Sequence, residues 1–413
     1  MLGCRATLLF RVLPVLCLLA GCSDSNGSSG LSSGNTSATA TTSDGGVSFK
    51  TFDDALKAEI AKYNATDAGM AQPIRGASAV VVHKDKGLLY SKGYGDFAAD
   101  RVYLIASSSK ILSVGVLMKL QDEGKLDINT PISEYLGSDW GDHKPEVTLA
   151  QLFSNSSGLP ALGEILALSS NPTAALLQQY GPHLCQYMAA GSLSDCGKSI
   201  YQDDNPDNNR KPDETFRYGG SQWQLGGAVA EVVSGKSWSQ LIQETYVEPC
   251  EVPTLGFTNP YGQPGVSPLG YPGFGADPSN LPSSENPSIE GGGYITAPDY
   301  AKLLLMHLRG GKCGDNEVLS PEAVETMQTD RVAAYGGKPT LGSGDESPYN
   351  GYGLAWWIDD QTVVDPGAYG AFPFLDRKRE YGAMIMFEAN NTIGGKIGFA
   401  VKPVLDSIID KLK

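Results

Sequence analysis

Strand-like segments lie near both ends of the chain and flank a long middle with a helical and loop-rich pattern. Five segments have the alternating or continuous apolar pattern of strands, bounded by turn residues: 77–83, 88–94, 353–359, 370–376 and 381–388. Strands this far apart share one core when they pair in a common sheet. We therefore predict an α/β (α+β) fold in which both termini build one antiparallel sheet, helices flank it, and a helical region at about 125–330 is inserted.

Helices are predicted beside these strands. Apolar residues recur on one face at 52–63, an apolar helix at 107–123 ends at Gly124, and a last helix at 402–413 closes the chain. A chain of 413 residues allows two or three domains, or one large composite domain. With strands of both ends in one sheet, we predict a single domain over residues 49–413.

Residues 1–21 have the layout of a secretory signal peptide. Arg5 and Arg11 precede an apolar run at 12–19, which is too short to span a membrane. The Ser-, Gly- and Thr-rich segment 22–48 has the composition of a flexible tether and not of a domain.

The end of the signal, Leu19-Ala20-Gly21-Cys22, resembles a bacterial lipoprotein box. The resemblance implies that the Cys22 thiol carries a diacylglyceryl group that anchors the chain in a membrane. Ser23 follows the cysteine, which in that family points to the outer membrane. The expected location is the bacterial cell envelope, facing the periplasm or the outer membrane. The alternative is an ordinary cleaved signal with a chance cysteine.

Four cysteines remain beyond Cys22: Cys185, Cys196, Cys250 and Cys313. An exported chain meets an oxidising compartment, where an even number of cysteines favours disulfides. We prefer the pairs Cys185–Cys196 and Cys250–Cys313, because the first is local. Without a C-x-x-C pattern or a neighbouring histidine, zinc is not expected.

The charge balance excludes one class of partner. Lys and Arg total 31 against 46 Asp and Glu, a formal net charge of -15. Nucleic-acid binding requires basic patches, so we predict no nucleic-acid partner.

Ser107 and Lys110 form an S-x-x-K pattern at the start of the predicted apolar helix. Residues three apart share a helix face, so the Lys110 amine can reach the Ser107 hydroxyl. The helix N-terminus favours negative charge on that oxygen. A buried lysine with a lowered pKa can accept the proton, so the serine needs no histidine. The alternative is a serine-rich helix cap followed by a surface lysine.

Six segments match, in order, the motifs of one superfamily: 105–110, 123–127, 148–159, 216–220, 228–236 and 291–300. From about residue 51 to its end the chain thus resembles the serine β-lactamase and penicillin-binding-protein superfamily. Within it, the resemblance is to class C β-lactamases, family VIII esterases and D-amino-acid-specific peptidases. It implies a β-lactamase/transpeptidase-like fold and a serine hydrolase that works through an acyl-enzyme without a cofactor.

Tyr218 aligns with the second-motif tyrosine of that superfamily. The resemblance implies a general base that works as a phenolate stabilised by Lys110, and an oxyanion hole formed by the backbone N–H groups of Ser107 and Ala368. The alternative is a buried packing tyrosine. The third residue of the motif is usually Asn but is Gly220 here, so an amide that would contact the substrate is missing.

The third motif of the family is usually K-T-G or H-x-G. Asp365-Pro366-Gly367 matches it better than Lys396-Ile397-Gly398, because only a helix is predicted after the latter. With Gly220, Asp365 and Gly367 are expected to line the substrate pocket. A cation at position 365 would attract a substrate carboxylate. Asp365 reverses that sign, an effect of about 4 kcal/mol for unit charges at ~4 Å before solvation.

These residues favour hydrolysis of a carboxylic ester or a related small-molecule acyl substrate. Hydrolysis of a β-lactam or of a D-amino-acid amide is the alternative within the enzyme class. The altered positions Gly220 and Asp365 also allow a non-catalytic binding lipoprotein of the cell envelope.

Three other patterns carry less weight. The G-x-S-x-G match at 30–34 lies in the tether, where the strand and helix of that motif cannot form. The four histidines lie away from the third motif, which argues against a Ser-His-Asp triad. Residues 203–214 have oxygen ligands at calcium-loop spacing, but Asn208 replaces the required glycine, so we favour a solvated acidic loop and predict no metal site.

Overall fold

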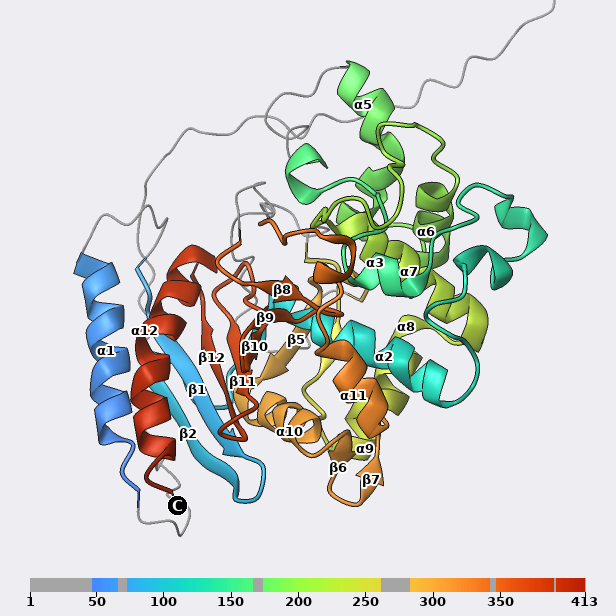
Figure 1. The fold of residues 1–413 in the computed structure, drawn as a ribbon. Helices are drawn as coiled ribbons and strands as arrows, with labels where there is room; N and C mark the ends of the chain where they lie inside the picture. The colour runs from blue at the N-terminus through green and yellow to red at the C-terminus, as the bar shows by residue number, and fades with distance from the viewer. Residues whose placement is uncertain are drawn as a thin grey trace, which may run out of the picture. The chain divides into compact units, whose positions relative to one another are not determined.

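Both ends of the chain contribute strands to one seven-stranded antiparallel sheet, in the order β2-β1-β12-β11-β10-β9-β8 (Figure 1). The N-terminal hairpin joins the C-terminal strands where β1 pairs with β12, from Ala77 opposite Phe387 to His83 opposite Tyr381. The predicted α/β (α+β) class is confirmed. The strands are β1 (Gly76–His83), β2 (Gly87–Gly95), β8 (Gly351–Tyr352), β9 (Trp357–Asp359), β10 (Thr362–Val364), β11 (Phe372–Asp376) and β12 (Tyr381–Phe387).

The structure is a computed structural model. It describes residues 47–65, 73–165, 174–260, 283–341, 347–389 and 391–412. The predicted signal peptide, the lipidation site Cys22 and nearly all of the predicted tether lie outside the described residues.

Helices cover both faces of the sheet. Helices α1 (Lys50–Ala65) and α12 (Asn391–Ile409) lie side by side on one face (Figure 1), and α10 (Ala297–Leu308) packs against β1 and β12 on the other. Successive side chains of a strand point to opposite faces. Accordingly, Ala79 is buried in the core with α1 and α12, and Val80 is buried in the core with α10.

The C-terminal helix is longer than predicted. Helix α12 begins at Asn391, whereas the sequence pattern placed its start at residue 402. Glycines at 394, 395 and 398 lower the helix propensity of this segment. The structure uses one of them for close packing, because a Cβ at Gly398 would lie 2.2 Å from the ring of Phe372.

Short strands were the main error of the sequence prediction. Only the end of the predicted strand 353–359 is a strand, β9. Its first half is a tight turn after β8 in which Ala355 has a φ of 71°, and both β8 and β10 were missed. Strands of two to four residues carry too little pattern to be recognised. The middle of the chain also holds missed strands, namely β3 (Val102–Leu104), β4 (Gly256–Phe257), β5 (Gly293–Thr296), β6 (Lys312–Cys313) and β7 (Asn316–Glu317).

The other described residues of the middle form helices and loops, as predicted. Its helices are α2 (Lys110–Asp122), α3 (Leu149–Phe153), α5 (Ala174–Tyr180), α6 (Leu193–Tyr201), α7 (Gly220–Ser234), α8 (Trp238–Ile242), α9 (Glu248–Cys250) and α11 (Pro321–Met327), with the 3-10 segments η1 (Ala106–Ser109) and η4 (Gly181–Tyr187).

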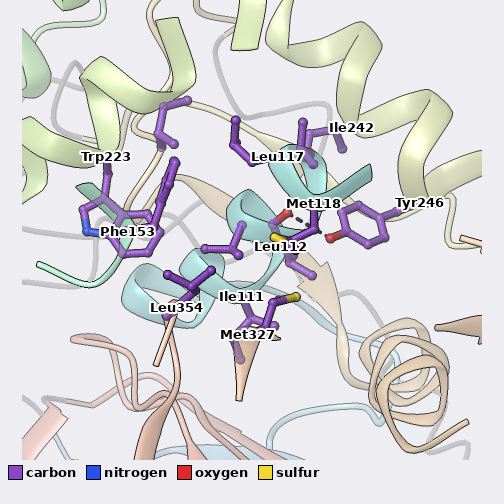
Figure 2. Close-up of a cluster of buried hydrophobic side chains, with 14 of the residues drawn as sticks. Ile111, Leu112, Leu117, Met118, Phe153, Trp223, Ile242, Tyr246, Met327 and Leu354 are labelled. Carbon is purple, nitrogen blue, oxygen red and sulfur yellow. Dashed lines mark hydrogen bonds between the residues drawn. The ribbon is translucent and has the colours of Figure 1, made fainter. Parts of the chain in front are cut away.

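Helix α2 runs through the centre of this region. It is buried on nearly every side, as expected of a helix that is apolar all round. Figure 2 shows Leu112 and Met118 of α2 enclosed by side chains from several helices. The Tyr246 hydroxyl donates a hydrogen bond to the Leu112 carbonyl at 2.9 Å. Each fully buried Leu or Met side chain contributes about 1.5–3 kcal/mol, so α2 is a firm base for the residues at its N-terminus.

Two disulfides tie this region together. Cys185–Cys196 joins η4 to α6, and Cys250–Cys313 joins α9 to β6. Both are the preferred pairs of the sequence prediction. Among the described residues, no helix is long and apolar enough to cross a membrane.

Candidate active site

The turn η1 presents Ser107 at the start of α2. Ser109 Oγ donates to the carbonyl of Ala106 at 2.5 Å and accepts from the Gly293 amide at 2.9 Å. Ser108 Oγ donates to the main-chain carbonyl of Asp365 at 2.6 Å. Ala106 has a φ of 46°, a conformation that non-glycine residues rarely adopt. Two of the three serines thus fix the turn, and the third, Ser107, is partly exposed.

Lys110 lies directly beside Ser107. Its Nζ donates to Ser107 Oγ at 3.1 Å and to the Glu290 carbonyl at 3.3 Å. The same Nζ lies 3.4 Å from Glu290 Oε2, and 4.7 Å and 5.3 Å from the ring centroids of Tyr218 and Trp223. The Lys110 side chain is fully buried. The predicted S-x-x-K contact is therefore present.

The pKa of Lys110 differs from the expectation. Burial alone lowers the pKa of its ammonium group, but the negative charges that Tyr218, Glu290 and Asp365 carry when ionised raise it more. The net pKa is raised, so Lys110 is an ammonium at neutral pH. The lowered lysine pKa expected from the sequence is wrong, because acidic neighbours far away in the sequence surround the amine.

Tyr218 is held just before α7. Its carbonyl accepts from the Leu162 amide at 2.7 Å, and the preceding Arg217 amide donates to the Asn155 carbonyl at 2.7 Å. Its ring stacks on Trp357 with centroids 5.5 Å apart. Burial raises the pKa of Tyr218, and the positive charge of Lys110 only partly offsets it. The resting protein therefore holds a phenol, and the expected phenolate is not its ground state.

Asp365 does not present a charge to a substrate. Its side chain is fully buried, and neither carboxylate oxygen has a hydrogen-bond partner of normal geometry among the described residues. Burial raises the pKa of Asp365 well above its usual value, although Lys110 and the Ile111 amide act in the opposite direction. Burial of this carboxyl group thus favours its neutral form. The expected reversal of charge in the pocket is not produced by Asp365.

The residues after Asp365 pack against the nucleophile turn. A Cβ at Gly367 would lie 2.1 Å from the Ile105 carbonyl, so only glycine permits this approach. Ala368 packs in the small apolar cluster that contains Ala106. The alternative third motif, 396–398, lies inside α12 and not on a strand. The oxyanion hole of Ser107 and Ala368 stays a prediction.

Gly220 faces two residues that the sequence analysis did not identify. A Cβ at this position would lie 2.1 Å from Gln186 Oε1 and 2.3 Å from Glu290 Oε1. Gln186 and Glu290 therefore fill the space that a larger side chain at 220 would take. Glu290 could have been noticed, because it is an acid placed directly before the matching block 291–300. Gln186 has no comparable sequence signal.

A row of serine, histidine and aspartate lies behind Gln186. His183 Nδ1 lies 2.9 Å from Ser221 Oγ, and His183 Nε2 lies 2.9 Å from Asp203 Oδ2. Ser221 and His183 are fully buried, and burial lowers the pKa of His183. This row has no access for a substrate and serves to hold the interior.

The acidic loop at 203–214 is organised by hydrogen bonds to its own chain. Asp203 accepts from Asn208 Nδ2 at 2.8 Å and from the Asn205 amide at 3.1 Å. Within the described part of the chain, no group of three or more His, Cys, Asp or Glu side chains is placed to hold a metal ion.

The sequence of this chain matches the model of a known protein family. The sequence model of the family described as Beta-lactamase matches residues 60–397. Protein flp of Staphylococcus aureus (strain N315) is 24% identical over 218 residues, which cover 50% of this chain and 39% of flp. The chain therefore spans well under half the length of that curated relative.

Three solved structures share the fold. A penicillin-binding protein homologue from Pyrococcus abyssi has a TM-score of 0.61 at 19% identity, covering 87% of this chain and 77% of that one. EstCE1, a hydrolase with promiscuous acyltransferase activity, has a TM-score of 0.61 at 18% identity, covering 84% and 99%. A D-stereospecific amidohydrolase from Streptomyces sp. has a TM-score of 0.57 at 17% identity, covering 84% and 97%.

Proposed function

We propose that this chain, which belongs to the Beta-lactamase family, is a serine hydrolase. In this proposal Ser107 forms an acyl-enzyme with a carboxylic ester or related acyl substrate. The observation that carries the proposal is the 3.1 Å contact between Lys110 Nζ and the partly exposed Ser107 Oγ. A serine hydroxyl becomes a nucleophile when a neighbouring group takes its proton and stabilises its charge.

Ser107 Oγ attacks the carbonyl carbon of the acyl substrate, and its proton passes to the coupled pair of Tyr218 and Lys110. Because the pKa values of both groups are raised, the form of the pair that has lost one proton is populated at alkaline pH. The Lys110 ammonium then stabilises the negative charge on the oxygens. The pair returns the proton to the leaving group, and water releases the acyl group by the reverse path.

The charges around Ser107 favour a substrate without a carboxylate. With Asp365 neutral, the ionised groups beside the nucleophile are Lys110 and Glu290, which pair at 3.4 Å. Their charges largely cancel, so an anionic substrate finds little excess positive charge. An uncharged ester is therefore our first substrate class, and the similarity to EstCE1 supports it.

A second candidate is the hydrolysis of a D-amino-acid amide or a β-lactam. The similarity in fold to the D-stereospecific amidohydrolase favours it. A third is a non-catalytic binding protein of the cell envelope, which the departures at Gly220 and Asp365 favour. For the location, the two disulfides support an oxidising compartment, and we propose a lipid anchor at Cys22, to be tested by mass spectrometry of the mature N-terminus.

Two acylating reagents separate these candidates. The chain without residues 1–21 is treated with a fluorophosphonate or with a penicillin, and its intact mass is measured together with Ser107→Ala and the matched control Ser108→Ala. A fluorophosphonate adduct on the wild type and on Ser108→Ala, but not on Ser107→Ala, is expected. A penicillin adduct would favour the second candidate. The absence of an adduct from either reagent would contradict the proposal that the chain is a serine hydrolase.

A further inference from the structure

Glu290 contacts Lys110 with both its side chain and its main chain. Its Oε2 lies 3.4 Å from Lys110 Nζ, and its carbonyl accepts a hydrogen bond from the same Nζ at 3.3 Å. The Lys110 side chain is fully buried, and that of Glu290 is 10% exposed. A buried ammonium group is costly unless an opposite charge and hydrogen-bond acceptors lie beside it. Glu290 supplies both.

The main chain on each side of Glu290 is tied to the turn and the helix that carry the nucleophile. Before it, the Ile289 carbonyl accepts a hydrogen bond from Ser113 Oγ of α2 at 2.7 Å. After it, the Gly293 amide donates to Ser109 Oγ of η1 at 2.9 Å. The carboxylate of Glu290 is therefore held at a fixed place relative to the nucleophile turn.

Gly220 leaves the space that the Glu290 side chain occupies. A Cβ at this position would lie 2.3 Å from Glu290 Oε1 and 2.6 Å from the carbon of its carboxyl group. Gly220 is not one of the glycines with a positive φ, so its backbone conformation does not require glycine. What requires glycine here is the space, because a larger side chain would displace the carboxylate from Lys110.

The other titratable side chains around Lys110 and Tyr218 are all acids: Glu290, Asp365, Tyr187 and Tyr352. Burial raises the pKa of the last three well above their usual values, which favours their neutral forms. Glu290 is therefore the neighbour, among the described residues, whose negative charge acts on the pair of Lys110 and Tyr218.

This charge affects the two members of the pair differently. Glu290 pairs directly with Lys110, whereas it acts on Tyr218 through its charge. Because charge interactions weaken with distance, Glu290 stabilises the ammonium form of Lys110 more than it destabilises a phenolate at Tyr218. The proton that the pair loses at alkaline pH therefore comes from Tyr218.

We propose that Glu290 is a positioning residue, which holds the Lys110 ammonium beside Ser107 and so makes Tyr218 the member of the pair that exchanges the proton. The role rests on the proposed function, because it acts through the reaction of Ser107. As Ser107 Oγ bonds to the carbonyl carbon, its proton passes to the phenolate oxygen of Tyr218. Lys110 keeps its three protons throughout. Gly220 is the second part of this arrangement, because it gives the Glu290 carboxylate its place.

The test is the pH dependence of kcat/KM for p-nitrophenyl acetate between pH 6 and 11, with circular dichroism at each pH to confirm the fold. Glu290→Gln keeps the shape and removes the charge. The apparent pKa of the alkaline rise should fall by about one unit, because loss of a negative charge makes the pair easier to deprotonate. The limiting kcat/KM should also fall, by about 10–100-fold, because Lys110 is held less well. A merely structural role would lower kcat/KM without moving the apparent pKa.

Two carboxylate variants serve as comparisons. Glu290→Asp keeps a negative charge near Lys110, so its apparent pKa should lie closer to that of the wild type than the apparent pKa of Glu290→Gln does. Glu388→Gln removes another partly buried acid, which pairs with Arg101, and should leave the apparent pKa unchanged.

Gly220→Ala tests the second part of the arrangement. It should lower the apparent pKa in the wild type but add little in the Glu290→Gln background, because the charge that it displaces is already gone. The control is Gly226→Ala on the same helix, where a Cβ would lie 2.5 Å from the ring of Phe153. This variant should lower the thermal stability without moving the apparent pKa.

The outcomes separate this inference from the proposed function. If the wild type hydrolyses the ester and Glu290→Gln has the same apparent pKa as the wild type, the role of Glu290 is refuted and the hydrolase stands. If the wild type neither turns over the ester nor forms a fluorophosphonate adduct, the proposed function itself fails.

Discussion

The two sides of the candidate active site differ in how their polar groups are satisfied. On the nucleophile side, Ser108, Ser109 and Lys110 all have hydrogen-bond partners that hold Ser107 in place. Elsewhere around the site, Gln186 Oε1 and both carboxylate oxygens of Asp365 have no hydrogen-bond partner of normal geometry among the described residues. Polar groups that have hydrogen-bond partners hold a rigid scaffold. A buried acceptor without a partner is satisfied only when a ligand, a water molecule or a proton reaches it. The nucleophile turn is therefore held more firmly by hydrogen bonds than the buried acceptors around it.

The largest effect is expected at the nucleophile. Ser107→Ala should lower kcat/KM for a p-nitrophenyl ester by about 10³-fold or more, because no other group can form the acyl-enzyme. The neighbouring Ser108→Ala should keep most of the activity, since Ser108 only ties the turn to Asp365. Equal losses of kcat/KM in both variants would contradict the assignment of Ser107 as the nucleophile.

Lys110 links the two sides. Lys110→Met should abolish activity and lower the free energy of unfolding by about 3–5 kcal/mol, because it leaves Glu290 without its buried partner. On the same helix, Lys119→Met removes only a partly exposed ion pair with Glu123 and should cost no more than about 1 kcal/mol. Urea unfolding measures both. Similar losses of unfolding free energy in the two variants would show that the buried pair of Lys110 and Glu290 contributes no more than a surface ion pair.

Tyr218→Phe should lower kcat/KM by about 10²–10⁴-fold, the contribution of a general acid–base, with little change in stability. In the wild type, kcat/KM should rise from pH 7 to pH 10, because the pKa values of Tyr218 and Lys110 are both raised. The rise should vanish in the variant. Tyr349→Phe, whose ring also contacts Trp357, is the control and should keep it. A flat wild-type profile would contradict the assignment.

The two disulfides should each stabilise the folded chain. Removing Cys185–Cys196 or Cys250–Cys313 by paired serine substitutions should cost about 2–4 kcal/mol of unfolding free energy in each case. The sequence separation is 63 for Cys250–Cys313 and 11 for Cys185–Cys196, so loss of Cys250–Cys313 should cost more, because it releases the longer loop in the unfolded chain. Urea unfolding measures both, and a larger loss for Cys185–Cys196 would contradict this expectation.

Asp365→Asn should have the smallest effect on activity, within about threefold, because no charge is lost at neutral pH. A buried acid with a raised pKa favours the protonated folded state, so the stability of the wild type should fall as pH rises from about 4, the usual Asp value, towards the raised pKa. The variant should lack this slope, whereas the surface control Asp85→Asn should retain it. Urea unfolding at pH 5, 7 and 9 checks this. If the stability of Asp365→Asn falls with rising pH as that of the wild type does, Asp365 is not the buried protonated acid responsible for the fall.

The sequence predicted what local geometry decides. Ser107 and Lys110 lie one helical turn apart, so their contact follows from the spacing alone. The common sheet of the two chain ends was predicted from their strand patterns, whereas the pairing of β1 with β12 was not. By contrast, Glu290 lies 180 residues from Lys110 in the chain, and no local pattern reports such a contact. Whether Asp365 is exposed is decided by how the turn before Gly367 packs on Ile105, which the sequence pattern does not reveal.

The assignment of Ser107 as the nucleophile is tested most directly by peptide mapping of the fluorophosphonate-labelled protein. Ser107, Ser108 and Ser109 lie in one peptide, and tandem mass spectrometry can locate the adduct among them. The structure predicts a single label on Ser107, because the other two hydroxyls are buried and donate to the main chain. A label on Ser108 or Ser109, or on a residue outside η1, would contradict the assignment.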